Sequence, residues 1–161
     1  MTPSTQTERS SKTVARILYG RIRIHVLTLI CLAASVAGAS ASADVVAERK
    51  ANFKANADAM KAIAAAISGG DRQTVREKAS GIAGWAAKIP AYFPEGSDGG
   101  DSKARAEIWF EFDSFTARAR ANQDAAEALV KAAETGDPAA MIAGLKNLGA
   151  SCKACHASFK D

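Results

Sequence analysis

The chain has 161 residues, of which 48% are hydrophobic, and it carries a formal net charge of +4 with a sequence pI of about 9.1. Five of its 21 Lys and Arg residues but only one of its 17 Asp and Glu residues lie before residue 44, so the rest of the chain has no formal net charge. The basic pI therefore gives no argument for nucleic-acid binding, and the length fits one folded domain.

Residues 1–43 have the three-part pattern of a cleaved secretory signal peptide. A polar and basic region precedes an apolar stretch that starts at Val26, and small residues then lead to Ala41-Ser42-Ala43. This Ala-x-Ala site predicts cleavage after Ala43. The apolar stretch is short for a membrane span, although an uncleaved anchor stays open. We therefore expect residues 44–161 to be exported as one domain, with neither a membrane nor a nucleic acid as its partner.

Two helices are predicted in the first half of this domain. Residues 44–67 are rich in Ala, lack Pro and Gly, and repeat apolar residues at helical spacing. Asp71 is the candidate N-cap of a second helix, which runs to about Ile89 and which Pro90 stops. The apolar stripe of the first helix consists of Val46, Phe53, Ala57, Met60, Ala64 and Ile67. That of the second consists of Val75, Ala79, Ile82, Ala86 and Ile89.

A long connection and two further helices follow. Residues 90–103 are dense in Gly and Pro, which predicts a loop, and a third helix is expected over residues 104–135. Asp137 and Pro138 are the predicted N-cap and first residue of a fourth helix, which ends near Lys160. The stripe of the third helix consists of Ile108, Phe112, Phe115, Ala119, Asn122, Ala126, Leu129 and Ala133. The fourth is expected to direct inward Met141, Ile142, Leu145, Leu148, Cys152, Cys155 and Phe159.

These patterns predict an all-α fold. No useful length of the sequence alternates between apolar and polar residues with period two, as a half-buried strand would. Four amphipathic helices with mostly short connections predict an antiparallel bundle, a fold in which cofactors lie between facing helices. The many alanines favour helix but bury little area each, so we expect the chain to be less stable when no cofactor fills its core.

The strongest chemical signal is the segment Cys152-Lys153-Ala154-Cys155-His156, close to the C-terminal end. Each thiol can form a thioether with one haem vinyl group, and the adjacent His156 can bind the iron as proximal ligand. On a helix, residues 152, 155 and 156 share one face. We therefore predict one haem c per chain, covalently attached through Cys152 and Cys155. Because such attachment takes place outside the bacterial cytoplasm, the expected location is the periplasm.

Three other interpretations of this segment are open to the sequence. A thiol–disulfide redox pair expects a surrounding βαβ pattern, which this helical sequence does not offer. A structural zinc site needs about four ligands, and residues 44–161 contain no second pair of Cys or His residues to complete one. A chance occurrence of the spacing is the third. Haem attachment is the interpretation that we adopt.

The sequence resembles the class II c-type cytochromes, above all cytochrome c′. The likeness covers the whole of residues 44–161 and implies an up-down-up-down four-helix bundle with the haem near the last helix. It also implies a homodimer and an unidentified periplasmic redox partner. The residues that carry it are Gly149 to His156, Phe93-Pro94-Glu95-Gly96-Ser97 with Gly99-Gly100-Asp101, Glu107-Ile108-Trp109, and Arg49, Phe53 and Met60.

The resemblance gives the first helix a decisive role. Phe53 stands where low-spin relatives, of the cytochrome c-556 type, place a methionine as sixth iron ligand, and phenylalanine has no lone pair to give. This register implies a five-coordinate, high-spin iron that binds NO and CO but disfavours oxygen, since bound oxygen gains from a distal hydrogen-bond donor. Met60, two helical turns further along, is the alternative sixth ligand, and Met141 is a weaker candidate.

Other pocket residues are implied in the same way. Arg49 is expected to pair with a haem propionate, which suits a guanidinium group, with an ordinary solvated arginine as the alternative. Trp85 and Phe159 are expected to flank the macrocycle, with plain core packing as the alternative. Lys160 stands where relatives often have arginine, which puts in doubt any part for it in polarising a proximal ligand.

Two functions fit these residues. The first is a gas-binding haem protein that also transfers electrons, and the alternative is a low-spin electron carrier with Met60 as sixth ligand. An enzyme such as a peroxidase is not expected, because heterolysis of peroxide needs a distal acid–base group and residues 44–161 contain no histidine besides His156.

Overall fold

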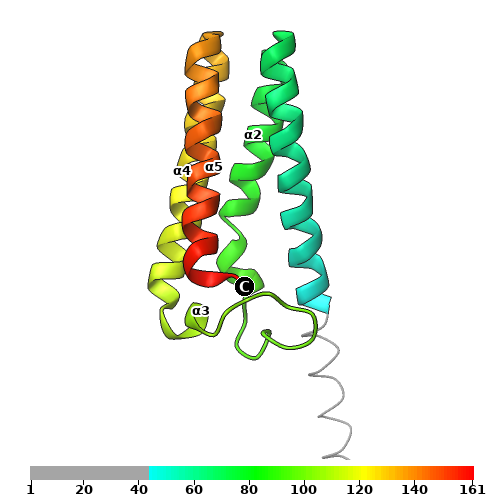
Figure 1. Ribbon diagram of the computed structural model, residues 1–161, viewed down its shortest axis with the longest axis vertical. Helices are drawn as coiled ribbons and strands as arrows, with labels where there is room; N and C mark the ends of the chain where they lie inside the picture. The colour runs from blue at the N-terminus through cyan, green and yellow to red at the C-terminus, as the bar shows by residue number, and fades with distance from the viewer. Residues whose placement is uncertain (1–43) are drawn as a thin grey trace, which may run out of the picture. The chain divides into compact units, whose positions relative to one another are not determined.

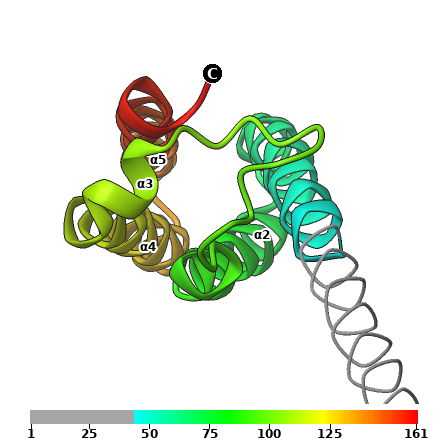
Figure 2. The same ribbon diagram turned by 90° about the horizontal axis from the view of Figure 1, so that it is seen from below.

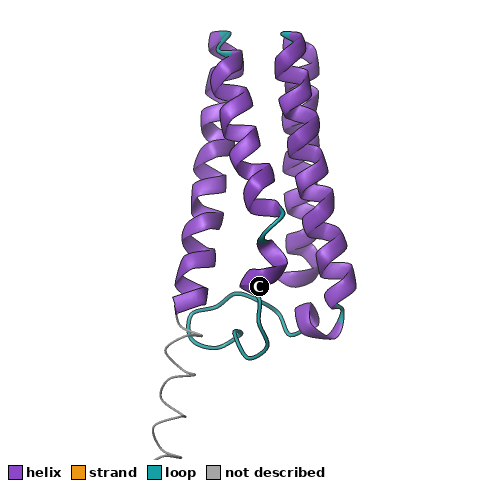
Figure 3. Cartoon of the chain, turned by 180° about the vertical axis from the view of Figure 1, so that it is seen from behind, coloured by secondary structure: helices purple, strands orange, loops and turns teal. Residues whose placement is uncertain are grey.

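The computed structural model describes residues 44–161, and the predicted signal peptide lies outside the described residues. Figure 3 shows helices joined by loops in this part of the chain. The elements in chain order are a first helix over residues 44–69, α2 (Arg72–Ala86), the 3-10 helix η1 (Ile89–Tyr92), α3 (Glu107–Phe110), α4 (Phe112–Thr135) and α5 (Pro138–Phe159).

The helix of residues 44–69, α2, α4 and α5 form an antiparallel, up-down-up-down four-helix bundle (Figures 1 and 2). Helix α4 packs against both α2 and α5. The end of the bundle at which α5 finishes also holds η1 and α3, and is called the motif end below (Figure 1). The predicted all-α bundle is confirmed. None of the helices within residues 44–161 is long and apolar enough to cross a membrane.

The predicted helix starts are confirmed at both turns away from the motif end. The Asp71 carboxylate accepts a hydrogen bond from the Thr74 backbone N–H at 3.0 Å, which caps α2. Asp137 caps α5 in the same way through the Ala139 N–H at 2.9 Å, with Pro138 at the first helical position. Gly136 ends α4 with φ of 73°, a left-handed conformation that glycine adopts without steric cost.

Helix α2 ends at Ala86, earlier than the expected Ile89. Pro90 has no N–H to donate, and its ring would collide with the carbonyl of residue 86 in a continuous α-helix. The chain makes a turn instead and restarts as η1, with Pro90 in its first turn. Ile89 is still buried, as its place on the apolar stripe predicts.

The expected third helix is divided into α3 and α4 at Glu111, whose φ of −122° and ψ of 43° are not helical. Residues 104–106 do not begin the helix either, because the Arg105 N–H donates to the Phe159 carbonyl at 3.1 Å. The break lets α3 lie at the motif end, where Trp109 Nε1 donates to the carbonyls of Phe93 and Pro94, both at 3.1 Å (Figure 2).

Several positions on the predicted stripes face water. Ile142 is 59% exposed and Phe112 is 39% exposed, and Ala57 and Ala64 are exposed as well. Ile63, which the predicted stripe leaves out, is fully buried. On the first helix, buried positions lie three residues after Val46 and Met60, at Arg49 and Ile63, whereas Ala57 and Ala64, four residues after Phe53 and Met60, are exposed. The predicted stripe therefore takes its second row from the wrong side of the helix.

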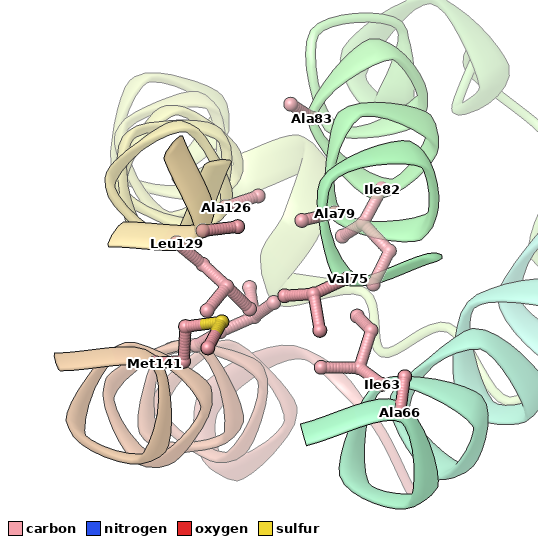
Figure 4. Packing of buried hydrophobic residues seen from close by; sticks show 11 residues of the cluster. Ile63, Ala66, Val75, Ala79, Ile82, Ala83, Ala126, Leu129 and Met141 are labelled. Carbon is pink, nitrogen blue, oxygen red and sulfur yellow. The ribbon is translucent and has the colours of Figure 1, made fainter. Parts of the chain in front are cut away.

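One cluster of aliphatic side chains fills the bundle away from the motif end, and we call it the apolar cluster. Figure 4 shows Ile63, Val75, Leu129 and Met141 pointing toward one another from the four long helices. The buried members are Ile63, Ala66, Val75, Ala79, Ile82, Ala83, Ala126, Leu129, Ala133, Met141 and Leu148. Many of these side chains are alanines, which are small, so the helices must pack close together for the side chains to touch.

The packing of α5 against α4 at Gly144 leads to a prediction. A Cβ atom added there would lie 3.0 Å from Leu129 Cδ1 and 3.4 Å from Leu129 Cα. We expect Gly144→Ala to lower the free energy of unfolding by about 1 kcal/mol, because the cost of overpacking, about 1–3 kcal/mol, exceeds the gain in helix propensity. Urea unfolding measures the change.

Gly81 on α2 is the matched control, since a Cβ atom there meets nothing within 4 Å. Gly81→Ala is expected to raise the free energy of unfolding by about 0.5–1 kcal/mol through helix propensity alone. Equal effects of the two substitutions would contradict the close packing at Gly144.

Candidate haem site

The three motif residues lie on the last turns of α5, at the motif end. Cys152 and Cys155 are half-buried free thiols, and His156 is exposed. The helix is held at this end by buried Phe159 and by backbone pairing beyond it, where Lys160 forms an antiparallel bridge with Ala104. The site is therefore fixed by its own helix and by the segment before α3.

The protonation of the motif residues follows from their surroundings. Burial raises the pKa of the Cys155 thiol, the charge of Cys152 raises it further, and Arg118 opposes the shift. Partial desolvation lowers the pKa of His156, and the positive charge of Lys160 lowers it further. Both effects favour the neutral imidazole. In this form one ring nitrogen carries no proton and can bind a metal.

Aromatic side chains pack around Cys155 and form the second cluster, which we call the aromatic cluster. Its buried members are Trp85, Ala86, Ile89, Phe93, Ile108, Phe115, Ala119 and Phe159. Cys155 and Phe53 are half-buried and pack against it. Phe53 meets Trp85 edge to face with ring centroids 5.5 Å apart, and Phe93 at 6.5 Å. Three predicted pocket residues, Phe53, Trp85 and Phe159, thus share one cluster with the motif.

Met60 and Met141 belong to the other cluster. Met60 packs against the apolar cluster and Met141 is one of its buried members. A Cβ atom at Gly149 would lie 3.7 Å from Met60 Cε, which places the methionine sulfur near that level of α5. Gly149 precedes His156 by seven residues, about 10 Å along a helix axis. The structure brings Phe53 to the cluster that contains Cys155 and does not bring Met60 there.

Arg49 is buried, with 3% of its surface exposed, so the alternative of an ordinary solvated arginine is wrong. Its Nη1 donates to the Tyr92 carbonyl at 3.2 Å and to Ser97 Oγ at 2.8 Å. Its Nη2 donates to the Ser97 carbonyl at 2.5 Å and to Ser102 Oγ at 2.6 Å. The guanidinium carbon also lies 4.3 Å from the Phe93 ring centroid. Burial lowers the pKa of Arg49, and nearby Asp98 partly opposes this.

These contacts give Arg49 a structural role that the sequence does not indicate. Its hydrogen bonds fasten the loop of residues 93–102 to the helix of residues 44–69. Ser97, which belongs to the segment of residues 93–97 that carries the resemblance, and Ser102, which no motif singled out, are the partners that make the burial of a charge tolerable. The predicted pairing of Arg49 with a haem propionate stays a prediction, and it would have to share the guanidinium with this loop.

The residues present fit a haem. They offer two thiols, a neutral imidazole and an apolar aromatic wall on neighbouring elements. Among the described residues, Trp85 Nε1 is the buried side-chain polar atom that has no hydrogen-bond partner. A buried N–H of this kind is costly unless an acceptor reaches it, and a propionate carboxylate is such an acceptor.

A polar residue on the apolar stripe of α4 also reaches the motif. Asn122 is buried, and its Nδ2 donates to Cys152 Sγ at 3.3 Å and to Ser151 Oγ at 2.8 Å. In the sequence, Asn122 is one more residue of the stripe, with no function indicated by its position. The sequence does contain one signal for Asn122, because it is the one polar side chain in a stripe whose other seven residues are apolar.

Comparisons with known proteins agree on one family. The family model described as Cytochrome C′ matches residues 44–160. The chain is 42% identical over 130 residues to cytochrome c′ of Rhodospirillum rubrum, covering 78% of this chain and 88% of that protein. It is 34% identical over 127 residues to cytochrome c-556 of Agrobacterium fabrum, covering 77% and 86%. A nitric oxide complex of a mutant cytochrome c prime from Alcaligenes xylosoxidans superposes with a TM-score of 0.66 at 29% identity, covering 74% and 96%.

The contacts of Arg49 lead to a prediction. Arg49→Lys should lower the free energy of unfolding by about 2–4 kcal/mol, because one ammonium cannot serve four acceptors in two directions and leaves buried polar groups unpaired. It should also make residues 93–102 the first site of proteolytic cleavage. Urea unfolding and limited proteolysis with mass spectrometry measure the two effects.

Lys50→Ala is the control for Arg49→Lys. Lys50 is the next residue in the chain and pairs with Asp101 of the same loop, but both side chains are exposed. Exposed ion pairs contribute little, so its loss should change the free energy of unfolding by about 0.5 kcal/mol or less. A similar loss in both variants would show that the buried network does not hold the loop.

Proposed function

Because the chain belongs to the cytochrome c′ family of haem-binding electron-transfer proteins, we propose that it is an exported, periplasmic cytochrome whose iron is five-coordinate and high-spin. In this proposal it binds NO and CO and exchanges electrons with a periplasmic partner. Cys152 and Cys155 hold one haem c by thioether bonds, and His156 is the proximal ligand. When bound, the haem supplies an iron that alternates between ferric and ferrous states and accepts a small ligand.

The observation that carries the proposal is the separation of Phe53 from Met60. Phe53 packs with Trp85 in the aromatic cluster that Cys155 joins, whereas Met60 packs in the apolar cluster. A phenyl ring has neither a lone pair for iron nor a donor for bound oxygen. An open iron beside such a ring suits NO and CO, whose binding depends less on a distal hydrogen bond.

The other residues of the site have supporting tasks. The aromatic cluster covers part of Cys155, and the Trp85 N–H offers a donor to a carboxylate of the cofactor. The charge of Lys160 helps keep His156 neutral, as an iron ligand must be. The nitric oxide complex of the similar Alcaligenes protein supports gas binding by this chain.

The low-spin electron carrier stays the second candidate, and the likeness to cytochrome c-556 supports it. In that case Met60 would be the sixth ligand. We also propose that the protein is not an enzyme, because residues 44–161 hold no second histidine for acid–base work on peroxide. Homodimer formation remains part of the proposal on the strength of family membership.

The first test is the visible absorption spectrum of the purified holoprotein. We expect high-spin spectra in both the oxidised and the dithionite-reduced protein, and a clear change of the reduced spectrum when NO is added. A sharp six-coordinate, low-spin spectrum that NO does not alter would refute the gas-binding proposal and leave the electron carrier.

Exchanging side chains at the two candidate positions gives a second test. Phe53→Met should convert the ferrous iron to a six-coordinate, low-spin state and slow NO binding by tenfold or more, because a thioether then occupies the open site. Met60→Leu is the matched control and should leave the spectrum unchanged, since Leu conserves volume in the apolar cluster. Loss of a low-spin spectrum on Met60→Leu would identify Met60 as the ligand instead.

A further inference from the structure

Asn122 occupies a place in α4 where an apolar residue would be expected. Its side chain is 6% exposed, and its neighbours on the buried face, Ala119 and Ala126, are apolar. Burying an amide without partners costs about 1–3 kcal/mol. A polar residue at such a position therefore needs hydrogen bonds that compensate for its desolvation. The partners in these hydrogen bonds indicate the role of Asn122.

Both known hydrogen bonds of the Asn122 amide nitrogen go to the beginning of the haem motif. Nδ2 donates to Ser151 Oγ at 2.8 Å and to Cys152 Sγ at 3.3 Å. Ser151 Oγ donates its own hydrogen to the Leu148 carbonyl at 2.7 Å. Since a hydroxyl has one hydrogen, Ser151 must accept from Asn122, and this fixes which end of the amide faces α5. The second N–H is then directed at the Cys152 sulfur.

The two motif sulfurs are held by different means. Cys155 packs against the apolar members of the aromatic cluster, and the desolvation there raises its pKa. Cys152 receives an N–H from the neighbouring helix instead. Helix packing alone does not call for this arrangement, because an apolar side chain at position 122 would fill the space without any cost of desolvation.

We propose that Asn122 is a positioning residue for the Cys152 sulfur. Its amide holds the sulfur in one direction on α5 and continues to donate to it after the thioether has formed, because a thioether sulfur remains a weak acceptor. With a haem attached at Cys152, the positive end of this N–H dipole would stabilise the ferrous state and raise the reduction potential. This inference rests on the proposed haem attachment at Cys152.

The test compares the wild-type holoprotein with Asn122→Leu, which keeps a similar volume but has no N–H to donate. We expect the resonance Raman C–S stretching band of Cys152, identified by its absence in Cys152→Ala, to shift in Asn122→Leu. The reduction potential should fall in Asn122→Leu. At a fixed applied potential, the ratio of ferrous to ferric protein should decrease about twofold. A merely structural residue would change stability and leave both readouts where they were.

Ser151→Ala is the matched control, because it removes the other acceptor of the same amide and leaves the contact with Cys152 in place. It should leave the Raman band and the potential unchanged. If Asn122→Leu yields too little holoprotein, Asn122→Ala also lacks the N–H, adds no volume and carries the same prediction. An unshifted band with an unchanged potential, or equal changes in Ser151→Ala, would overturn the proposal.

Failure of the underlying attachment is recognised separately. The mass of the unfolded chain and its pyridine haemochrome spectrum report how many thioether bonds are present. A wild-type chain without a thioether at Cys152 would overturn the proposed function at that residue, and the inference about Asn122 with it. A chain with both thioethers and unaltered spectroscopy in Asn122→Leu would overturn only the role of Asn122.

Discussion

The burial of the Arg49 guanidinium is the interaction on which the motif end depends. A charge with 3% of its residue exposed must find partners inside the protein, and Arg49 finds them in Ser97 and Ser102 of the long loop. The same group lies over the Phe93 ring, and Phe93 in turn meets Phe53 and Phe115 edge to face. Arg49 therefore contacts both the loop and the aromatic cluster from the first helix, with Phe53 making the next contact to the same cluster.

The two ends of the bundle are built differently. Away from the motif end, alanines and Gly144 let the helices approach closely, and small aliphatic side chains fill the space. At the motif end, large aromatic rings and buried polar contacts replace close approach. Rings can line a site for a large planar cofactor, whereas tightly packed alanines leave no room for one. The apolar cluster and the Cys-x-x-Cys-His motif thus lie in differently packed parts of the bundle.

The sequence was sufficient for the features that local rules determine. Periodicity and capping residues predicted the helices and the starts at Asp71 and Asp137. The haem site on α5 stays a prediction from the Cys-x-x-Cys-His spacing. Features that depend on contacts distant in sequence were not predictable. The break at Glu111 accompanies the packing of Trp109 on the carbonyl of Phe93, and the burial of Arg49 depends on a serine 48 positions away. The predicted stripe also misjudged Ile63, because Met60 has an apolar residue both three and four positions further on, and the pattern does not say which of the two faces the other helices.

The two candidate functions, gas binding and low-spin electron transfer, differ in whether Phe53 or Met60 lies beside the iron. Met60 lies among residues that all four long helices contribute, so bringing it to the motif would uncover apolar surface throughout that cluster. Phe53 needs no such movement, since it already packs against Trp85 beside Cys155. A register shift of two turns is also opposed by Arg49, whose four hydrogen bonds fix the first helix against the loop one turn before Phe53. The arginine that fastens the loop thus also keeps the phenyl ring, and not the thioether, at the proposed site.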